Sequence, residues 1–168
     1  MTRYLLDTNI FIQAKNLHYV FDFCPAFWEW LITPNGTGRV ASIDKVGDEL
    51  QAGGDDLSDR AVDRGRGFFL PPDDPVVPAL GRVSAWATGQ NYEAAAIATF
   101  LQVADYWLVA HALAHDFIVV THEVPSDSTR KIKIPNACIG LGLTCISPYD
   151  MLRRERARFV LGPAPGAA

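Results

Sequence analysis

Arg3-Tyr-Leu-Leu-Asp-Thr-Asn-Ile-Phe-Ile12 is the stretch of sequence that decides the fold. A short apolar run stops at a carboxylate, Asp7, and the apolar pattern resumes after two small polar residues. This order predicts a first β-strand that ends in an acid, followed by a helix capped by Thr8 or Asn9. Ligands of open α/β folds bind at the carboxyl ends of parallel strands, so Asp7 is placed to hold a metal or to accept a phosphoryl group. The alternative is that Asp7 only caps the helix.

The rest of the chain also alternates between short apolar runs and helical stretches. Further strands are expected over residues 39–43, 117–121 and 143–146, and the continuous β-branched run at 117–121 is typical of a buried parallel strand. Helices are expected over about 9–15, from Pro25 onwards, and over 44–52, 57–66, 76–87, 92–101, 106–115 and 148–159. Strands separated by helices predict a three-layer α/β/α sandwich with a central parallel sheet of about four to five strands.

Length and composition restrict the class of protein. A chain of 168 residues fits one domain, expected over residues 1–160, with a flexible C-terminal tail over 161–168. Hydrophobic residues at 49% and charged residues at 20% indicate a folded globular chain. The apolar runs are far shorter than the ~20 residues of a membrane span, and no basic and apolar leader precedes the first strand. The three cysteines form no Cys-x-x-Cys pair and are expected to be reduced and mostly buried, as in a cytoplasmic protein.

The net charge of −4 argues against a protein that binds nucleic acid by bulk charge. It leaves room for a local basic rim around an acidic pocket. A cluster of metal-binding carboxylates would itself supply about four of the negative charges.

Two further acids lie on predicted helices beside the apolar face. Glu49 follows Val46 by three residues and so lies next to the inward stripe of its helix. Asp105 precedes Leu108 and Val109 by three and four residues and shares their face. An unpaired charge there is costly, so Asp105 is expected to have a metal or a basic partner. The alternatives are a half-exposed surface glutamate and an N-terminal aspartate favoured by the helix dipole.

Glu123 follows the strand at 117–121 by two residues, much as Asp7 follows the first strand. If the two strands are neighbours, both acids meet at one edge of the sheet. Alternation directs the adjacent His122 away from Glu123, so we expect no ligand role for that histidine. A polar loop residue is the alternative for Glu123.

Four converging carboxylates form a hard site rich in oxygen atoms. Such a site suits Mg²⁺ or Mn²⁺ better than Zn²⁺, and without a cation the acids would repel one another strongly. A divalent cation polarises a phosphodiester and lowers the pKa of its bound water. The four acids therefore predict phosphodiester hydrolysis with one or two metal ions.

Four segments in this order resemble the PIN-domain nucleases, a family that includes the VapC-type toxins of prokaryotic toxin–antitoxin pairs. They are Leu5-Leu-Asp-Thr-Asn-Ile-Phe-Ile12, Val46-Gly-Asp-Glu-Leu50, Ala104-Asp-Tyr-Trp-Leu-Val-Ala-His-Ala112 and Val119-Val-Thr-His-Glu123. The resemblance implies a metal-dependent ribonuclease with an RNA substrate, frequently a homodimer, and raises the prospect of an antitoxin partner.

Residue by residue, the family's four acids map to Asp7, Glu49, Asp105 and Glu123, and its supporting positions to Asn9 and Thr121. The fourth acid of the family is more often an aspartate. The chain is also longer than a compact toxin, with apparent insertions at the aromatic segment 21–32 and over residues 55–90.

Basic residues close to the last acid are candidates for binding RNA phosphates. Alternation places Lys131 and Lys133 on one side of their segment, near Glu123, and Lys15 ends the first helix. A solvated basic loop is the alternative for the two later lysines. The aromatic segment 21–32 is expected to fill the core rather than to stack on bases.

Two other functions compete with the nuclease. A phospho-receiver domain also uses strand-end acids, Mg²⁺, a threonine and a lysine, but Thr8 and Asn9 do not supply the acidic neighbour that its first acid has. A PIN-like module that binds RNA or a partner without cutting is the second alternative. All four acids are present, which favours the enzyme over that module.

Overall fold

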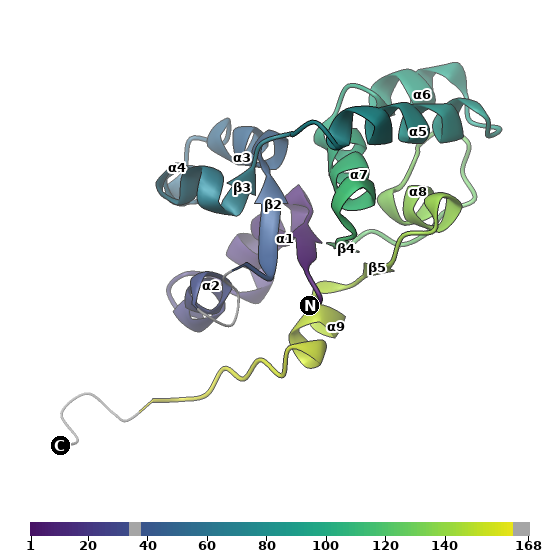
Figure 1. Ribbon diagram of the computed structural model, residues 1–168. Coiled ribbons are helices and arrows are strands. Elements are labelled where there is room, and N and C mark those ends of the chain that lie inside the picture. Colours follow the sequence, from purple (N-terminus) through teal and green to yellow (C-terminus); the bar gives the residue numbers. More distant parts are fainter. Residues whose placement is uncertain (34–37, 163–168) are drawn as a thin grey trace.

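The centre of the molecule is a parallel five-stranded sheet with the strand order β3-β2-β1-β4-β5 (Figure 1). The computed structural model describes residues 1–33 and 38–162. The strands are β1 (Tyr4–Leu6), β2 (Val40–Ile43), β3 (Phe69–Leu70), β4 (Ile118–Val120) and β5 (Cys145–Ile146). The register pairs Leu5 of the central strand with Ala41 on one side and Val119 on the other. Asp7 therefore leaves the sheet beside the end of β4, as the sequence predicted.

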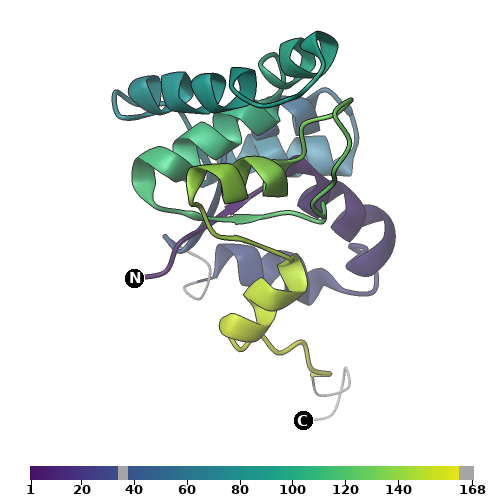
Figure 2. The same ribbon diagram turned by 90° about the vertical axis from the view of Figure 1, so that its right-hand side faces the viewer.

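Helices cover both faces of the sheet and complete the predicted α/β/α sandwich. They are α1 (Thr8–Gln13), the π-helix η1 (Ala14–His18), α2 (Pro25–Ile32), α3 (Asp44–Gln51), α4 (Asp56–Phe68), α5 (Val76–Thr88), α6 (Ala94–Phe100), α7 (Ala104–His115), α8 (Ile134–Leu141) and α9 (Pro148–Arg154). Figure 2 shows α7 and α8 on one side of the strands, and α1, α2 and α9 on the other. Helices lie on both faces of the sheet because the direction of the crossovers reverses. The chain first runs from β1 to β2 and β3, and then returns to β4 and β5 on the other side of β1. Right-handed crossovers in opposite directions place their helices on opposite faces of a sheet.

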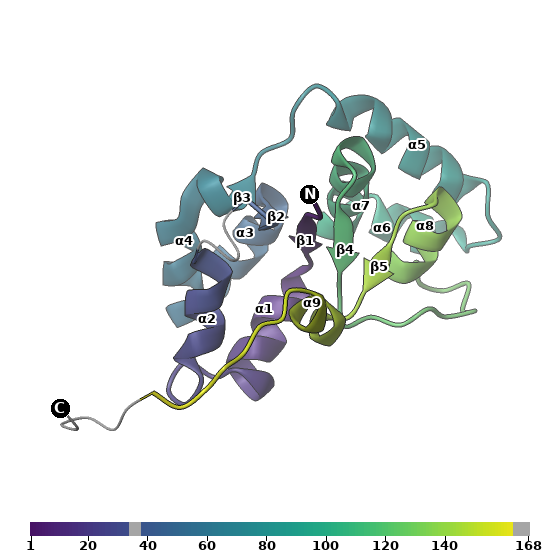
Figure 3. The same cartoon turned by 60° about the horizontal axis from the view of Figure 1, so that its bottom comes forward.

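Two helices, α3 and α7, bring acidic residues toward the carboxyl edge of the sheet. α3 begins directly after β2 and contacts both α1 and α7. α7 leads into β4 and runs against β2 and β4, so its first turn lies where the strands end (Figure 3). This arrangement carries Glu49 and Asp105 toward the edge at which Asp7 and Glu123 lie.

The core consists of the sheet and the apolar faces of these helices. All three residues of β1 and all four of β2 are buried. In the aromatic segment, Phe27, Trp28 and Trp30 are buried, which confirms their predicted place in the core, whereas Phe23 is 69% exposed. The side chain of Tyr19 stacks on Phe27 with ring centroids 4.3 Å apart, and this contact fixes the end of η1.

Several elements differ from the sequence-based prediction. The first helix continues through η1 to His18, where the Tyr19 amide donates to the Ala14 carbonyl in the wider π-helical pattern. The last helix ends at Arg154 instead of residue 159. β3 was not predicted because its two residues are too few to show a period. α8 was not predicted because the residues that lead into it, 130–134, alternate as an extended segment would.

The predicted tail at 161–168 falls largely on residues 163–168, which lie outside the described residues; Leu161 is fully exposed. Within the described part of the chain, no single helix is long and apolar enough to cross a bilayer. Only α6 and α7 taken together, across a bend of 68°, would match by length and composition.

Candidate active site

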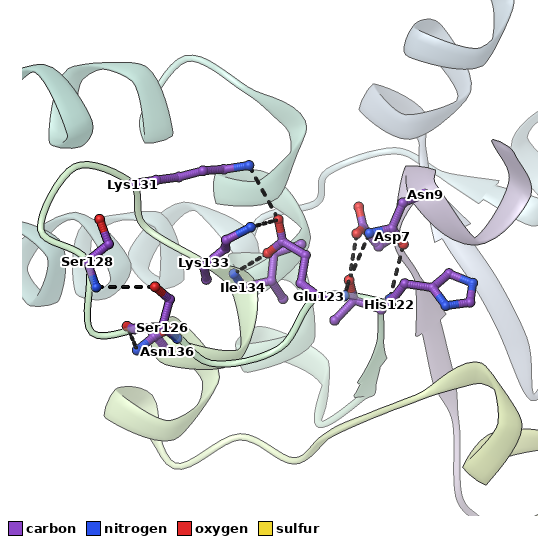
Figure 4. A network of polar contacts seen from close by, with 11 residues as sticks. Asp7, Asn9, His122, Glu123, Ser126, Ser128, Lys131, Lys133, Ile134 and Asn136 are labelled. Atoms are coloured by element: carbon purple, nitrogen blue, oxygen red, sulfur yellow. Dashed lines mark hydrogen bonds and ion pairs between the residues drawn. The ribbon is translucent and has the colours of Figure 1, made fainter. Parts of the chain in front are cut away.

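Asp7 lies at the carboxyl end of β1 with its side chain buried and 5% exposed. Its carboxylate accepts a hydrogen bond of 2.8 Å from the Thr121 hydroxyl. The amide of Asn9 donates to the same hydroxyl oxygen at 3.2 Å, while its carbonyl oxygen accepts from the His122 amide at 3.2 Å (Figure 4). The ends of β1 and β4 are thus joined by a continuous polar network. Thr121 thus contacts Asp7 directly and Asn9 contacts it through Thr121, while the supporting role that the family resemblance implies for both stays a prediction.

Asp7 is also the residue that precedes α1, but its side chain makes no capping hydrogen bond, and no cap from Thr8 or Asn9 forms. The predicted cap is therefore wrong. Asn9 is engaged with the end of β4, and the Thr8 hydroxyl donates across to Glu49 Oε2 at 2.5 Å. The polar residues after β1 serve the edge of the sheet rather than the start of the helix.

Glu123 is half-buried and turns toward the segment that precedes α8. Its Oε2 accepts a hydrogen bond of 2.9 Å from the Ile134 amide, and its Oε1 lies 3.6 Å from the ammonium groups of both Lys131 and Lys133. Both lysines face Glu123 while Ile132 between them is buried, as the alternating pattern predicted. Glu123 is thus the acid of this edge that has basic partners (Figure 4).

Asp105 lies in the first turn of α7 and Glu49 on an exposed part of α3. Burial, together with the charges of Glu123 and Glu49, raises the pKa of Asp105 to about 6, and Lys131 opposes this shift. Burial also raises the pKa of Asp7 to about 7, with added repulsion from Asp105 and Glu123. The four predicted acids therefore act on one another electrostatically at one edge of the sheet.

These residues suit a divalent cation by their chemistry. They present hard carboxylate oxygens, and the raised pKa values of Asp7 and Asp105 reflect burial first and neighbouring negative charge second. Within residues 1–33 and 38–162, no three carboxylate, histidine or cysteine side chains surround one point as metal ligands do. The contacts of Glu123 with the lysines and of Glu49 with Thr8 hold those two carboxylates to other partners. Cation binding would require Glu123 to exchange lysine contacts for the metal.

Two other predicted residues lie apart from this group of acids. The Lys15 ammonium pairs with Asp55, the residue that caps α4, so its predicted contact with RNA remains a prediction. His122 points away from Asp7 and Glu123, in agreement with its expected orientation (Figure 4). The centroid of its ring lies 5.4 Å from that of the His18 ring, and the two rings are stacked. The sequence analysis gave no role to Thr8 beyond capping and none to the Ile134 amide, since only the folded chain brings them to the acids.

The stability of the metal-free protein should depend on pH through Asp7. The pKa of this carboxyl is raised from 3.8 to about 7, so the folded state keeps a proton that the unfolded state loses in this interval. The free energy of unfolding of the wild type should therefore fall relative to Asp7→Asn as the pH rises from about 4 to about 7, by an amount on the order of a few kcal/mol. Urea unfolding of both proteins in EDTA measures the difference.

The exposed Asp48→Asn variant of α3 is the control and should follow the wild type at every pH. A constant difference between wild type and Asp7→Asn across this range would contradict the account of a strained buried carboxyl.

The fold and this acidic edge together define a parallel α/β/α domain with two carboxylates that follow strand ends, Asp7 and Glu123, and two on adjacent helices, Glu49 and Asp105. A family model described as a domain of unknown function, DUF4411, matches residues 4–159, and the chain belongs to that family. No curated protein matches the sequence. Among solved structures, a chain of the crystal structure of VapBC2 from Rickettsia felis, bound to a DNA fragment from their promoter, is similar, with a TM-score of 0.54 and 18% identity. The match covers 87% of this chain and 98% of that chain, and at this identity it shows a shared fold.

The strand order argues against the phospho-receiver alternative. Flavodoxin-like domains have the order 2-1-3-4-5, with the first strand second from one edge. Here β1 is the central strand, with β2 and β3 on one side and β4 and β5 on the other.

Proposed function

We propose that the chain is a PIN-like ribonuclease that depends on Mg²⁺ or Mn²⁺ and hydrolyses RNA phosphodiester bonds at Asp7, Glu49, Asp105 and Glu123. The observation that carries the proposal is the arrangement of Asp7, buried at the end of β1, with the partly buried Asp105 of α7 and Glu123 beyond β4, where burial and neighbouring like charges raise the pKa values of Asp7 and Asp105. A protein retains such a costly arrangement when a cation and a reaction need it. The fold shared with a chain of a VapBC2 structure supports the same reading.

The contacts of the four acidic side chains suggest a separate role for each in cation binding. Asp7 and Asp105, the two acids whose pKa values burial raises most, would form the fixed part of the cation site. Thr121 and Asn9 hold the Asp7 carboxylate in place. Glu123 and Glu49 are held by weaker or exposed contacts and would adjust when the cation binds. A divalent cation supplies charge that stabilises the scissile phosphate and lowers the pKa of a water nucleophile.

The direct test is cleavage of a mixed RNA pool by the purified wild-type protein. Cleavage should require added Mg²⁺ or Mn²⁺ and stop in EDTA. Absence of cleavage with both metals, together with unchanged RNA binding by Asp7→Asn, would favour the non-cleaving binding module instead.

Lys131 and Lys133 are proposed to hold the phosphates of the RNA backbone. A cleft beside Asp105 is lined by Arg130, Lys131 and Ile132 on one side and by residues of α6 on the other. It gives an RNA strand a positively charged wall directly next to the acids. The two lysines would release Glu123 to the cation and turn to the phosphates when RNA and metal bind.

Replacement of both lysines, Lys131→Ala with Lys133→Ala, should weaken RNA binding and flatten its salt dependence. Each lost phosphate contact lowers the slope of log K against log salt by about 0.7 for a single strand. Metal affinity should not fall, since the lysines compete with the cation for Glu123. Fluorescence anisotropy over a series of salt concentrations measures the slope.

The matched control removes two exposed arginines of α4 and α5 with the same total charge, Arg66→Ala with Arg82→Ala. An equal loss of slope in this control would show that the effect is one of net charge and not of the lysine pair.

An antitoxin-like partner and a homodimer remain part of the proposal. An apolar groove between α1, α2 and α4 is lined by Phe11, Trp28 and Leu57 and bordered by Arg60 and Arg64. The groove suits an apolar segment with acidic residues. Co-purification of the chain with the product of any small adjoining reading frame tests the partner, and light scattering tests the dimer; a monomer that retains no partner would contradict both.

A further inference from the structure

Three rings gather beside the acids, on the side away from the lysines. His18 ends η1, His122 follows β4, and Tyr149 lies in the first turn of α9. The ring centroids are 5.4 Å apart for the two histidines, 5.7 Å for His18 and Tyr149, and 5.8 Å for His122 and Tyr149. The Tyr149 hydroxyl lies 3.1 Å from His18 Nε2. We call these three side chains the ring cluster.

The ring cluster is fixed to the same network that holds Asp7. The backbone amide of His122 donates to the side-chain Oδ1 of Asn9. The side-chain amide of Asn9 donates to the Thr121 hydroxyl, which in turn donates to the Asp7 carboxylate. These hydrogen bonds fix the backbone of His122 relative to the Asp7 carboxylate, and the contacts with His18 and Tyr149 hold its ring.

The other end of the ring cluster is anchored through η1. Its last hydrogen bond, from the Tyr19 amide to the Ala14 carbonyl, widens the helix just at His18. Tyr19 packs on Phe27 and its carbonyl accepts from the Trp28 indole at 2.6 Å. π-helical turns are rare and occur frequently at functional sites. Here His18 is exposed while its neighbour Tyr19 is partly buried and packs against the core.

The ring cluster is nevertheless open to solvent. His18 is exposed, and Tyr149 is 36% exposed although it is a large aromatic side chain. Rings that served only to join η1 to α9 would be more stable if they were buried. Flat, exposed rings are a usual surface on which single-stranded RNA stacks its bases, because every base has a flat face that can stack.

We propose that the ring cluster is a base-stacking subsite that holds one base of a single-stranded RNA next to the phosphate at the acids. This inference rests on the proposed ribonuclease function. Figure 4 shows Lys131 and Lys133 on one side of Asp7 and His122 on the other. A strand that crosses the acids would have its backbone neutralised by the lysines and one base held by the rings. The subsite thus sets the position of the scissile phosphate without reading the base.

The test is a thermodynamic cycle that combines substitutions in the ring cluster with RNA from which one base has been removed, and compares the RNA affinities. Labelled short oligoadenylate, and versions with one abasic nucleotide at each position in turn, are bound to Asp7→Asn protein in Mg²⁺. One abasic position should lower affinity by about tenfold, and His18→Leu with Tyr149→Leu should lower it by a similar factor for the intact strand. In the ring variant, the abasic nucleotide at that position should then have no further effect. Tyr149→Phe, which keeps the ring, should bind like the parent protein.

Phe23→Leu, which removes an exposed aromatic ring outside the ring cluster, is the control and should leave the abasic profile unchanged. Thermal melting checks that each variant is folded, and the abasic series on the parent protein needs no ring substitution. If the wild-type protein cuts RNA and the ring variants bind and cut it equally well, the stacking subsite would be overturned while the proposed nuclease function would stand. Failure of the wild type to bind or cut RNA would overturn both.

Discussion

Asp7→Asn is expected to lower the rate of metal-dependent RNA cleavage by at least about a hundredfold. Even the removal of a residue that only hydrogen-bonds to a metal ligand typically lowers metal affinity or activity by about ten- to a hundredfold. The variant keeps the size of the side chain and an oxygen that can accept from Thr121. It removes the charge that would hold the cation. Asp105→Asn should have a similar effect, because Asp105 is the other acid of the group that is both desolvated and close to like charges.

Cleavage of the same RNA by equal amounts of purified protein measures this loss. If the chain acts as a toxin, expression of the wild type should slow growth and both variants should relieve it. Asp48→Asn, next to Glu49 but exposed, is the control and should remain active. Full activity of Asp7→Asn would remove this residue from the chemistry.

Mg²⁺ or Mn²⁺ is expected to raise the melting temperature of the wild type and to have a smaller effect on Asp7→Asn. A ligand that binds only the folded state at one hundred times its Kd adds about 2.7 kcal/mol, which corresponds to roughly 5–10 °C for a domain of this size. The burial and the like charges that raise the pKa values of Asp7 and Asp105 disfavour their ionised forms, and a bound cation would offset this cost. Equal shifts in the two proteins at the same metal concentration would argue against a metal role for Asp7.

Much of this architecture could be predicted from sequence because the deciding signals are local. A strand that stops at Asp7 and a β-branched run that stops before Glu123 place two acids at the ends of two strands, and the register of β1 and β4 confirms that these strands are neighbours. The alternation of residues 130–134 placed Lys131 and Lys133 on one side of their segment, and the structure shows that this side faces Glu123.

Other features depend on tertiary contacts that carry no local signal. The Thr8 hydroxyl meets Glu49 across two helices, and the Ile134 amide meets Glu123 only because α8 begins there. The ring cluster joins residues from positions 18, 122 and 149, and η1, which places the first of them, does not differ in periodicity from an ordinary helix end. These two histidines and one tyrosine are far apart in the sequence, so they form no motif from which the cluster could be predicted.

Anomalous diffraction from crystals grown with Mn²⁺ tests most directly the central claim that the four acids form one cation site. We expect a manganese peak bound by Asp7 and Asp105, with Glu123 turned from Lys131 and Lys133 toward the ion. Manganese bound only elsewhere, with Glu123 still paired to the two lysines, would contradict the claim.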